Sequence, residues 1–154
     1  MRDEYYHDAD APRANTLVPA ASAVVVDEAG RVLLQRRRDG GGWSLPGGTM
    51  EIGESIGGCV VREVREETGL EVEPVRIVGV YSDPCRVIAF ADGEVRQEFS
   101  ICFACRITAG ALAAGEESSE VGFFHPAELA ELDLPEQTRL RLDDYLADRG
   151  PAIR

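Results

Sequence analysis

The sequence predicts an α/β (α+β) sandwich, in which a mixed central β-sheet lies between helices. Segments rich in Val, Ile and Phe have the alternation of strands, and they surround one central helical segment, with further helical segments near the carboxyl end. A length of 154 residues is enough for one domain with a core and short for two. We therefore expect a single domain over residues 16–148, a flexible arm at 1–15 and a tail at 149–154.

The first half of the domain is predicted to begin with a β-hairpin. Residues 16–27 are rich in Val and Ala, which is typical of a buried strand, and residues 31–36 form the second strand after a Glu-Ala-Gly turn. A glycine-rich loop at 39–42 then leads to the central helical segment.

The second half is predicted to hold a strand at 71–81 and a hairpin of residues 87–90 and 94–107 around an Asp-Gly turn. A last strand at 120–125 precedes a proline that suits the first position of a helix. An amphipathic helix at 136–146 ends the domain.

The charge of the chain limits its partners. The net charge of −12 argues against electrostatic binding to nucleic acid or to an anionic membrane. All 16 basic residues are arginine, so lysine Schiff bases and a Walker-type lysine are excluded. The first ten residues are polar and acidic, and the longest apolar stretch is far shorter than a membrane span. We expect a cytoplasmic protein.

The four cysteines are expected to be buried free thiols rather than a metal site. Cys102 and Cys105 have C-x-x-C spacing, but the segment alternates like a strand, and residues three apart in a strand point to opposite faces. A zinc site would also need a second pair of ligands, and none is evident.

The central segment at residues 48–70 has the signals of a helix. Ser55 suits the N-cap and Gly69 the position just past the carboxyl end. An apolar stripe at i, i+4 and i+8 can face a core: Ile56, Val60 and Val64.

Three glutamates fall on one face of this helix, at i, i+3 and i+4: Glu63, Glu66 and Glu67. Carboxylates crowded in this way repel unless cations neutralise them, and hard divalent cations such as Mg²⁺ prefer oxygen ligands. The alternative is a surface helix with a solvated acidic face, which would not explain the spacing of the rest of the segment.

The whole segment resembles the Nudix box, which is a glycine, five residues, a glutamate, seven residues, then R-E, an aliphatic residue, any residue, E-E, any residue, a glycine and an aliphatic residue. Every fixed position is met: Gly48, Glu54, Arg62, Glu63, Val64, Glu66, Glu67, Gly69 and Leu70. The resemblance implies a Nudix-type α/β/α sandwich over residues 16–146, with the box as a loop–helix–loop.

The resemblance also implies an activity and a cofactor. Nudix hydrolases cleave the diphosphate of a nucleoside diphosphate linked to another group, with Mg²⁺ and sometimes Mn²⁺. By position, Glu63, Glu66 and Glu67 are similar to the family's metal-binding and catalytic glutamates, and the carbonyl of Gly47 to its backbone ligand. In parts of the family the glutamate matching Glu63 is the general base, so which glutamate has that role here stays open.

Family members often add a glutamate from the loop before the last strand, as a metal ligand and catalytic residue. The candidates are Glu116, Glu117 and Glu120, and Glu120 comes first because it adjoins the predicted strand. The alternative for each is a solvated loop acid.

Other residues of the box are expected to support this site. Arg62 is expected to pair with Glu54 or with Glu66 one turn on, so Arg62 and Glu54 are structural candidates. Gly48 has a structural role as the first position of the box.

Substrate contacts are expected from outside the box. Arg36 and Arg38 would share one face of their strand and bind phosphate. Tyr81 and Asp83 follow the strand after the box and are candidates for contact with base or ribose, whereas Trp43 is better explained as a core residue.

The resemblance implies a nucleotide-type small molecule as the substrate, and within the family we favour ADP-ribose or a nucleotide sugar. The motifs of the coenzyme A and NADH subgroups are absent, and Pro84 lies near the position where ADP-ribose-type members often have a proline. Hydrolysis of oxidised or non-standard nucleoside triphosphates is an alternative, and a non-catalytic ligand-sensing Nudix module is another. Because family members are often homodimers, a homodimer is also expected.

Overall fold

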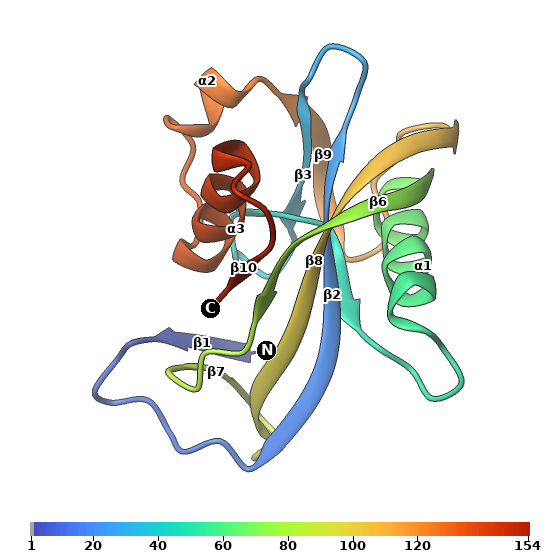
Figure 1. Cartoon of the computed structure of the whole chain (residues 1–154). Helices are drawn as coiled ribbons and strands as arrows, with labels where there is room; N and C mark the ends of the chain where they lie inside the picture. Colours follow the sequence, from blue (N-terminus) through green and yellow to red (C-terminus); the bar gives the residue numbers. More distant parts are fainter. Residues whose placement is uncertain (1) are drawn as a thin grey trace.

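A computed structural model describes residues 2–154. Its strands are β1 (Arg2–Tyr6), β2 (Thr16–Val26), β3 (Val32–Arg37), β4 (Trp43–Ser44), β5 (Gly47–Thr49), β6 (Leu70–Tyr81), β7 (Arg86–Phe90), β8 (Val95–Gly110), β9 (Ser118–Phe124) and β10 (Ala152–Ile153). Its helices are α1 (Ile56–Thr68), α2 (Pro126–Leu129) and α3 (Glu136–Ala147). Helix α1 covers one side of the central strands, and α2 and α3 lie on the other side (Figure 1).

Strands β2 and β8 form the centre of a mixed sheet. They pair in parallel from Thr16 opposite Arg96 to Val26 opposite Arg106. Strand β8 also pairs antiparallel with β6 and β7, and β3 pairs antiparallel with β2, β4 and β9. The expectation of a mixed sheet between helices is confirmed.

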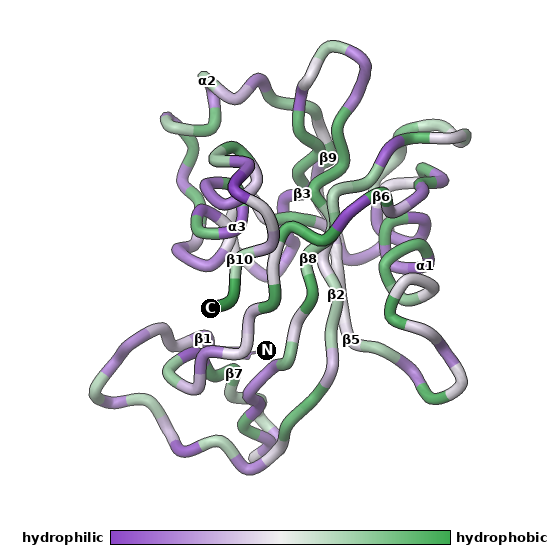
Figure 2. The backbone as a smooth tube through the Cα atoms, in the orientation of Figure 1, coloured by the Kyte–Doolittle hydropathy of each residue, from purple (hydrophilic) through white to green (hydrophobic). Residues whose placement is uncertain are grey.

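Alternation along the strands divides the core into two clusters, one under α1 and one under α3. In β2, Ala23 and Val25 pack with Val60 and Val64 of α1, whereas Val24 packs with Leu142 of α3. The middle parts of β2 and β8, between the helices, are correspondingly hydrophobic (Figure 2).

The cysteines follow the same alternation. Cys102 belongs to the cluster under α3 and Cys105 to the cluster under α1, so the two residues of the C-x-x-C spacing point to opposite faces, as expected. Cys59 is also buried. The expectation of a buried thiol is wrong for Cys85, which is exposed because it lies in the turn between β6 and β7.

Helix α1 begins and ends at the expected residues. The hydroxyl of Ser55 accepts a hydrogen bond from the backbone N–H of Gly58 at 3.0 Å, and Gly69 has φ of 76°, the left-handed conformation that glycine adopts without strain. These caps fix where the carboxylates of the box stand relative to the sheet.

Both ends of the chain take part in the sheet, unlike the expected arm and tail. Strand β1 pairs antiparallel with β7, and β10 pairs in parallel with β6 at Gly79 and Val80. These short segments carry little local strand signal, and the free edges of β7 and β6 supply the hydrogen-bond partners.

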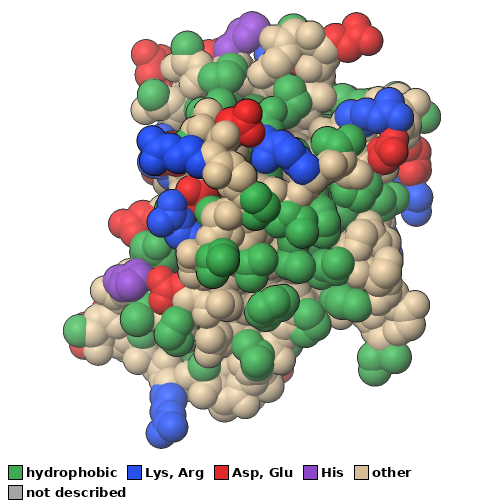
Figure 3. Space-filling view, viewed as in Figure 1, with side chains coloured by type: hydrophobic (Ala, Val, Ile, Leu, Met, Phe, Trp, Pro, Cys, Tyr) green, Lys and Arg blue, Asp and Glu red, His purple; other side chains and the backbone are tan. Residues whose placement is uncertain are grey.

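Exposed apolar side chains gather over β6 and β8 on one face of the molecule (Figure 3). Val75, Ile77 and Phe99 are among the exposed large residues of these strands. The homodimer stays a prediction. Within residues 2–154, no helix combines the length and hydrophobicity needed to span a membrane.

Candidate active site

One cavity of about 700 Å³ brings the box together with strands and a helix that are remote from it in sequence. The carboxylate side of this cavity is formed by Glu63, Glu67, Glu116 and Glu117. The arginine side is formed by Arg2, Arg37, Arg86, Arg96 and Arg141. Arg38 also lines the cavity beside Glu116, and Asp39 and Glu98 line it beside their arginine partners. The cavity therefore joins a side rich in carboxylates to a side rich in arginines.

Helix α1 presents two of its three glutamates to the cavity. Glu63 and Glu67 lie four residues apart, on the same face of the helix, and both line the cavity. Glu66 lies at the edge of this face, outside the lining, and its side chain is 58% exposed.

Glu67 is held in place by two donors. Its Oε2 accepts hydrogen bonds from the side-chain Nε2 of Gln35 at 2.9 Å and from the backbone N–H of Gly47 at 2.9 Å. The hydroxyl of Ser118 donates to Oε1 of Gln35 and fixes the orientation of the amide. Sequence reasoning missed Gln35, although a polar residue at the end of a buried run is a signal that a strand reaches a polar site.

The two cavity glutamates are difficult to ionise in the absence of a cation. Burial, reinforced by the nearby Glu63, raises the pKa of Glu67 to about 8 although Gly47 and Gln35 donate to it. Burial also raises the pKa of Glu63 against the opposing effect of Arg62, and Glu117 raises both pKa values. This set of oxygen donors fits a hard divalent cation, whose charge would offset the repulsion.

Arg62 makes both contacts expected of it. Its Nε donates to Glu54 at 2.6 Å and one Nη donates to Glu66 at 3.3 Å, and further bonds reach Glu63 at 2.9 Å and the carbonyl of Thr49 at 3.1 Å. The guanidinium lowers the pKa of Glu54 to about 2. Arg62 thus links the loop of the box to its helix.

The two glycines before this loop leave no space for a side chain. A Cβ on Gly48 would lie 2.4 Å from Oε1 of Glu63, and a Cβ on Gly47 would lie 2.3 Å from the carbonyl oxygen of Ala21. The carboxylate of Glu63 can therefore approach the backbone of β5 only because residue 48 is glycine.

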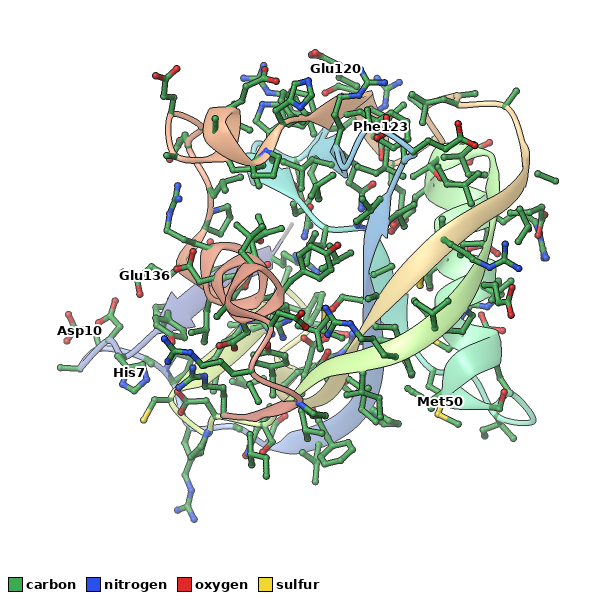
Figure 4. All side chains as sticks on the ribbon, turned by 45° about the horizontal axis from the view of Figure 1, so that its top comes forward. His7, Asp10, Met50, Glu120, Phe123 and Glu136 are labelled. Carbon is green, nitrogen blue, oxygen red and sulfur yellow. The ribbon has the colours of Figure 1, made fainter. Side chains whose placement is uncertain are left out.

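The loop before β9 supplies different acids from the one expected first. Glu116 and Glu117 line the cavity, whereas Glu120 lies within β9 opposite Arg36 and is exposed at the upper edge of the molecule (Figure 4). Strand β9 begins at Ser118, two residues earlier than predicted, so Glu120 belongs to the strand and not to the loop.

Two consecutive arginines reach the cavity from the end of β3. Arg37 and Arg38 line it, and Nε of Arg38 donates to the carbonyl of Glu116 at 2.8 Å. Arg36 is exposed outside the cavity, unlike the expectation that it shares a face with Arg38. The pairing of β3 with β9 shifts register between Arg36 and Arg37, and such a bulge redirects the side chains that follow it.

Two other expected substrate contacts lie away from the cavity. Tyr81 is buried, and its hydroxyl donates to Asp144 at 2.8 Å, because this face of β6 packs under α3. Asp83 lies 2.6 Å from Nε2 of His7 on another part of the surface. Trp43 packs edge-on against Phe124 with ring centroids 4.9 Å apart, as expected of a core residue.

The comparisons with known proteins agree with this architecture. The NUDIX domain model matches residues 16–146. A MutT-like protein of Streptomyces ambofaciens is 37% identical over 135 residues, which cover 88% of this chain and 80% of the relative. An ADP-ribose pyrophosphatase of Methanocaldococcus jannaschii is 34% identical over 125 residues, which cover 79% of this chain and 69% of the relative. The crystal structure of an ADP-ribose pyrophosphatase from Streptococcus suis superposes with a TM-score of 0.64 at 27% identity, covering 90% of this chain and all of the other.

Fold, cavity and relatives together define a hydrolase of phosphoric anhydride bonds. The chain belongs to the Nudix family. Members of this family generally use a divalent cation, typically Mg²⁺, and act on nucleotide-type small molecules.

Proposed function

We propose that this protein is a Mg²⁺-dependent pyrophosphohydrolase that cleaves the diphosphate of ADP-ribose or of a related nucleotide sugar. The observation that carries the proposal is that half-buried Glu63 and Glu67 line the same cavity as a group of arginines. Such a cavity suits a substrate whose diphosphate binds a cation at one side while the rest of the molecule extends to the other. The relatives named as ADP-ribose pyrophosphatases support the choice of substrate.

Glu63, Glu66, Glu67 and the carbonyl of Gly47 are the proposed ligands of Mg²⁺, which Mn²⁺ can replace. We assign the additional loop carboxylate to Glu117 in preference to Glu120, because Glu117 lines the cavity and raises the pKa of both Glu63 and Glu67. A cation held by these residues would supply charge neutralisation and would make a coordinated water more acidic.

The residues around these ligands have supporting roles. Gln35 and the N–H of Gly47 hold Glu67 in one orientation, and Arg62 holds Glu63. Arg38 is the proposed phosphate contact, because it lines the cavity and has no carboxylate partner among the described residues. Preorganised charge of this kind is the main contribution of the protein to phosphoryl transfer.

The test is hydrolysis with Mg²⁺ across ADP-ribose, UDP-glucose and 8-oxo-dGTP, with the products identified. We expect AMP from ADP-ribose and no turnover after chelation of the metal. Release of pyrophosphate from 8-oxo-dGTP alone would replace the proposal by triphosphate hydrolysis. Binding without turnover of all three would replace it by a ligand-sensing module.

A further inference from the structure

The arginine side of the cavity contains one buried cation without a counter-ion. Arg141 of α3 lines the cavity and is only 7% exposed. To the residues that the structure describes, its side chain makes one hydrogen bond, from Nη1 to the backbone carbonyl of Gln137 at 2.9 Å, and its guanidinium lies 4.3 Å from the centroid of the Tyr81 ring. Within residues 2–154, no carboxylate lies within 4.0 Å of it.

The other four arginines of this side are each paired with an acid. The pairs are Arg2 with Glu4 at 2.7 Å, Arg37 with Asp39, Arg86 with Glu98 at 2.7 Å, and Arg96 with Glu94 at 2.7 Å. Among the described residues, Arg141 therefore differs from these four in lining the cavity without an acid partner.

A buried guanidinium without an anion is costly for the free protein. The face of the Tyr81 ring attracts the cation but does not neutralise it. Burial and the nearby Arg86 lower the pKa of Arg141, against the smaller opposing effects of Cys102, Tyr81 and Glu98. An anion that entered the cavity would find strong, geometrically fixed donors there.

Gln137 lies one turn before Arg141 on α3 and contains a second buried polar group that lacks a hydrogen-bond partner among the described residues. The side-chain Oε1 of Gln137 is buried and has no hydrogen-bond partner in the described part of the chain, whereas its Nε2 donates to Glu4 at 2.8 Å. That bond directs Oε1 as a free acceptor, so the wall combines a cationic donor with an acceptor. A ligand that satisfies both carries an anionic group and a nearby hydroxyl or N–H.

We propose that Arg141 binds an anionic group, carboxylate or phosphate, on the part of the substrate that is distant from the scissile diphosphate. Gln137 accepts a hydrogen bond from a hydroxyl beside that group. This inference rests on the proposed function and narrows it to nucleoside diphosphates linked to an acidic or a phosphorylated sugar. Arg141 comes from α3 and the box carboxylates come from α1, on opposite sides of the sheet, so the two groups enter the shared cavity from different elements (Figure 1).

The experiment compares substrate pairs that differ in one anionic group. UDP-glucose and UDP-glucuronate differ by a carboxylate, and ADP-ribose and ADP-ribose 1″-phosphate differ by a phosphate on the terminal ribose. We expect kcat/KM to favour the acidic member of at least one pair by about tenfold or more, the size expected for a hydrogen-bonded charge pair. The pair that shows the preference identifies the anion.

Arg141→Met tests the residue, because methionine keeps an apolar chain of similar length without the charge. We expect the preference for the acidic member to fall about tenfold to a hundredfold. Arg106→Met is the matched control, since Arg106 is 64% exposed, pairs with Glu73 and is not part of the cavity lining. It should keep the preference of the wild type.

Metal-free binding separates this inference from the proposed function. Calorimetry in EDTA should show tighter binding of the acidic member to the wild-type protein, even if none of the four compounds is hydrolysed. Equal affinity for both members of both pairs would overturn the inference without any variant. A loss in Arg141→Met that is equal for acidic and neutral members would also overturn it, because Arg141 would then bind the diphosphate common to both.

Discussion

The two sides of the cavity are built in different ways. On the carboxylate side, Glu63 and Glu67 come from one helix and are four residues apart, so the geometry of the helix alone brings them together. The arginine side takes one residue each from β1, β3, β7, β8 and α3, which span residues 2–141. A sequence motif can specify the first kind of site, whereas the second kind exists only after the chain has folded.

The two sides also differ in charge balance. On the carboxylate side, Glu63 and Glu67 have raised pKa values, and the nearby Arg62 already donates to several partners. The carboxylate side therefore needs a cation. The arginine side is neutralised by its own acids except at Arg141. Changes on the carboxylate side should therefore affect turnover of every substrate, and changes on the arginine side should affect the choice among substrates.

Removal of a charge from the carboxylate side should have the largest effect. Glu67→Gln keeps the shape of the side chain but removes the proposed ligand, and we expect kcat to fall about a thousandfold, the equivalent of several kcal/mol of charge stabilisation. Steady-state kinetics at saturating Mg²⁺ measures this, with circular dichroism to verify folding. A rate near that of the wild type would show that Glu67 does not bind the metal.

Displacement of a carboxylate without removing it should have the next largest effect. The added methyl group of Gly48→Ala would collide with Glu63, and a shift of about 1 Å at a reacting centre can cost about a hundredfold in rate. Gly57→Ala is the matched control, because nothing lies within 4 Å of its Cβ, and it should stabilise α1 by about 0.5–1 kcal/mol. Equal activity of the two variants would contradict the close approach of Glu63 to β5.

Substitution of an acid near the start of β9 should have a smaller effect. It should show which of Glu117 and Glu120 supports the metal site. We expect Glu117→Gln to weaken the apparent affinity for Mg²⁺ about tenfold, as is typical for a residue that supports a metal site. Glu120→Gln should leave it unchanged, since Glu120 lies outside the cavity. Titration of activity with Mg²⁺ compares the two variants, and the reverse order would return the role to Glu120.

The smallest effect concerns stability. The pKa of Glu67 is raised from 4.5 to about 8 in the folded, metal-free protein, so its contribution to stability is complete below about pH 4.5 and is lost as the pH rises through 8. In EDTA we expect Tm to fall by about 5 °C between pH 5.5 and 8.5, the equivalent of 1–2 kcal/mol for a chain of this size. Mg²⁺ should restore most of the loss at pH 8.5.

Glu67→Gln is the control for this pH dependence, because it removes the titrating group. The variant should have a flatter profile in EDTA than the wild type. Identical profiles would mean that other groups cause the loss.

Much of the fold could be predicted because its signals are local. The caps at Ser55 and Gly69, the buried face of α1 and the alternation of β8 each depend on residues within a few positions of one another. The terminal strands β1 and β10 could not be predicted, since their pairing depends on edges formed by β7 and β6.

The sequence by itself determined the family, the helix of the box and the spacing of its glutamates, because helical periodicity converts spacing directly into geometry. Only the tertiary structure decided that Gln35 orients Glu67, that a bulge turns Arg37 toward the cavity, and that Arg141 lies buried without an acid. Each of these depends on contacts between residues far apart in the chain. Such contacts depend on how the strands and helices pack, which no local pattern encodes.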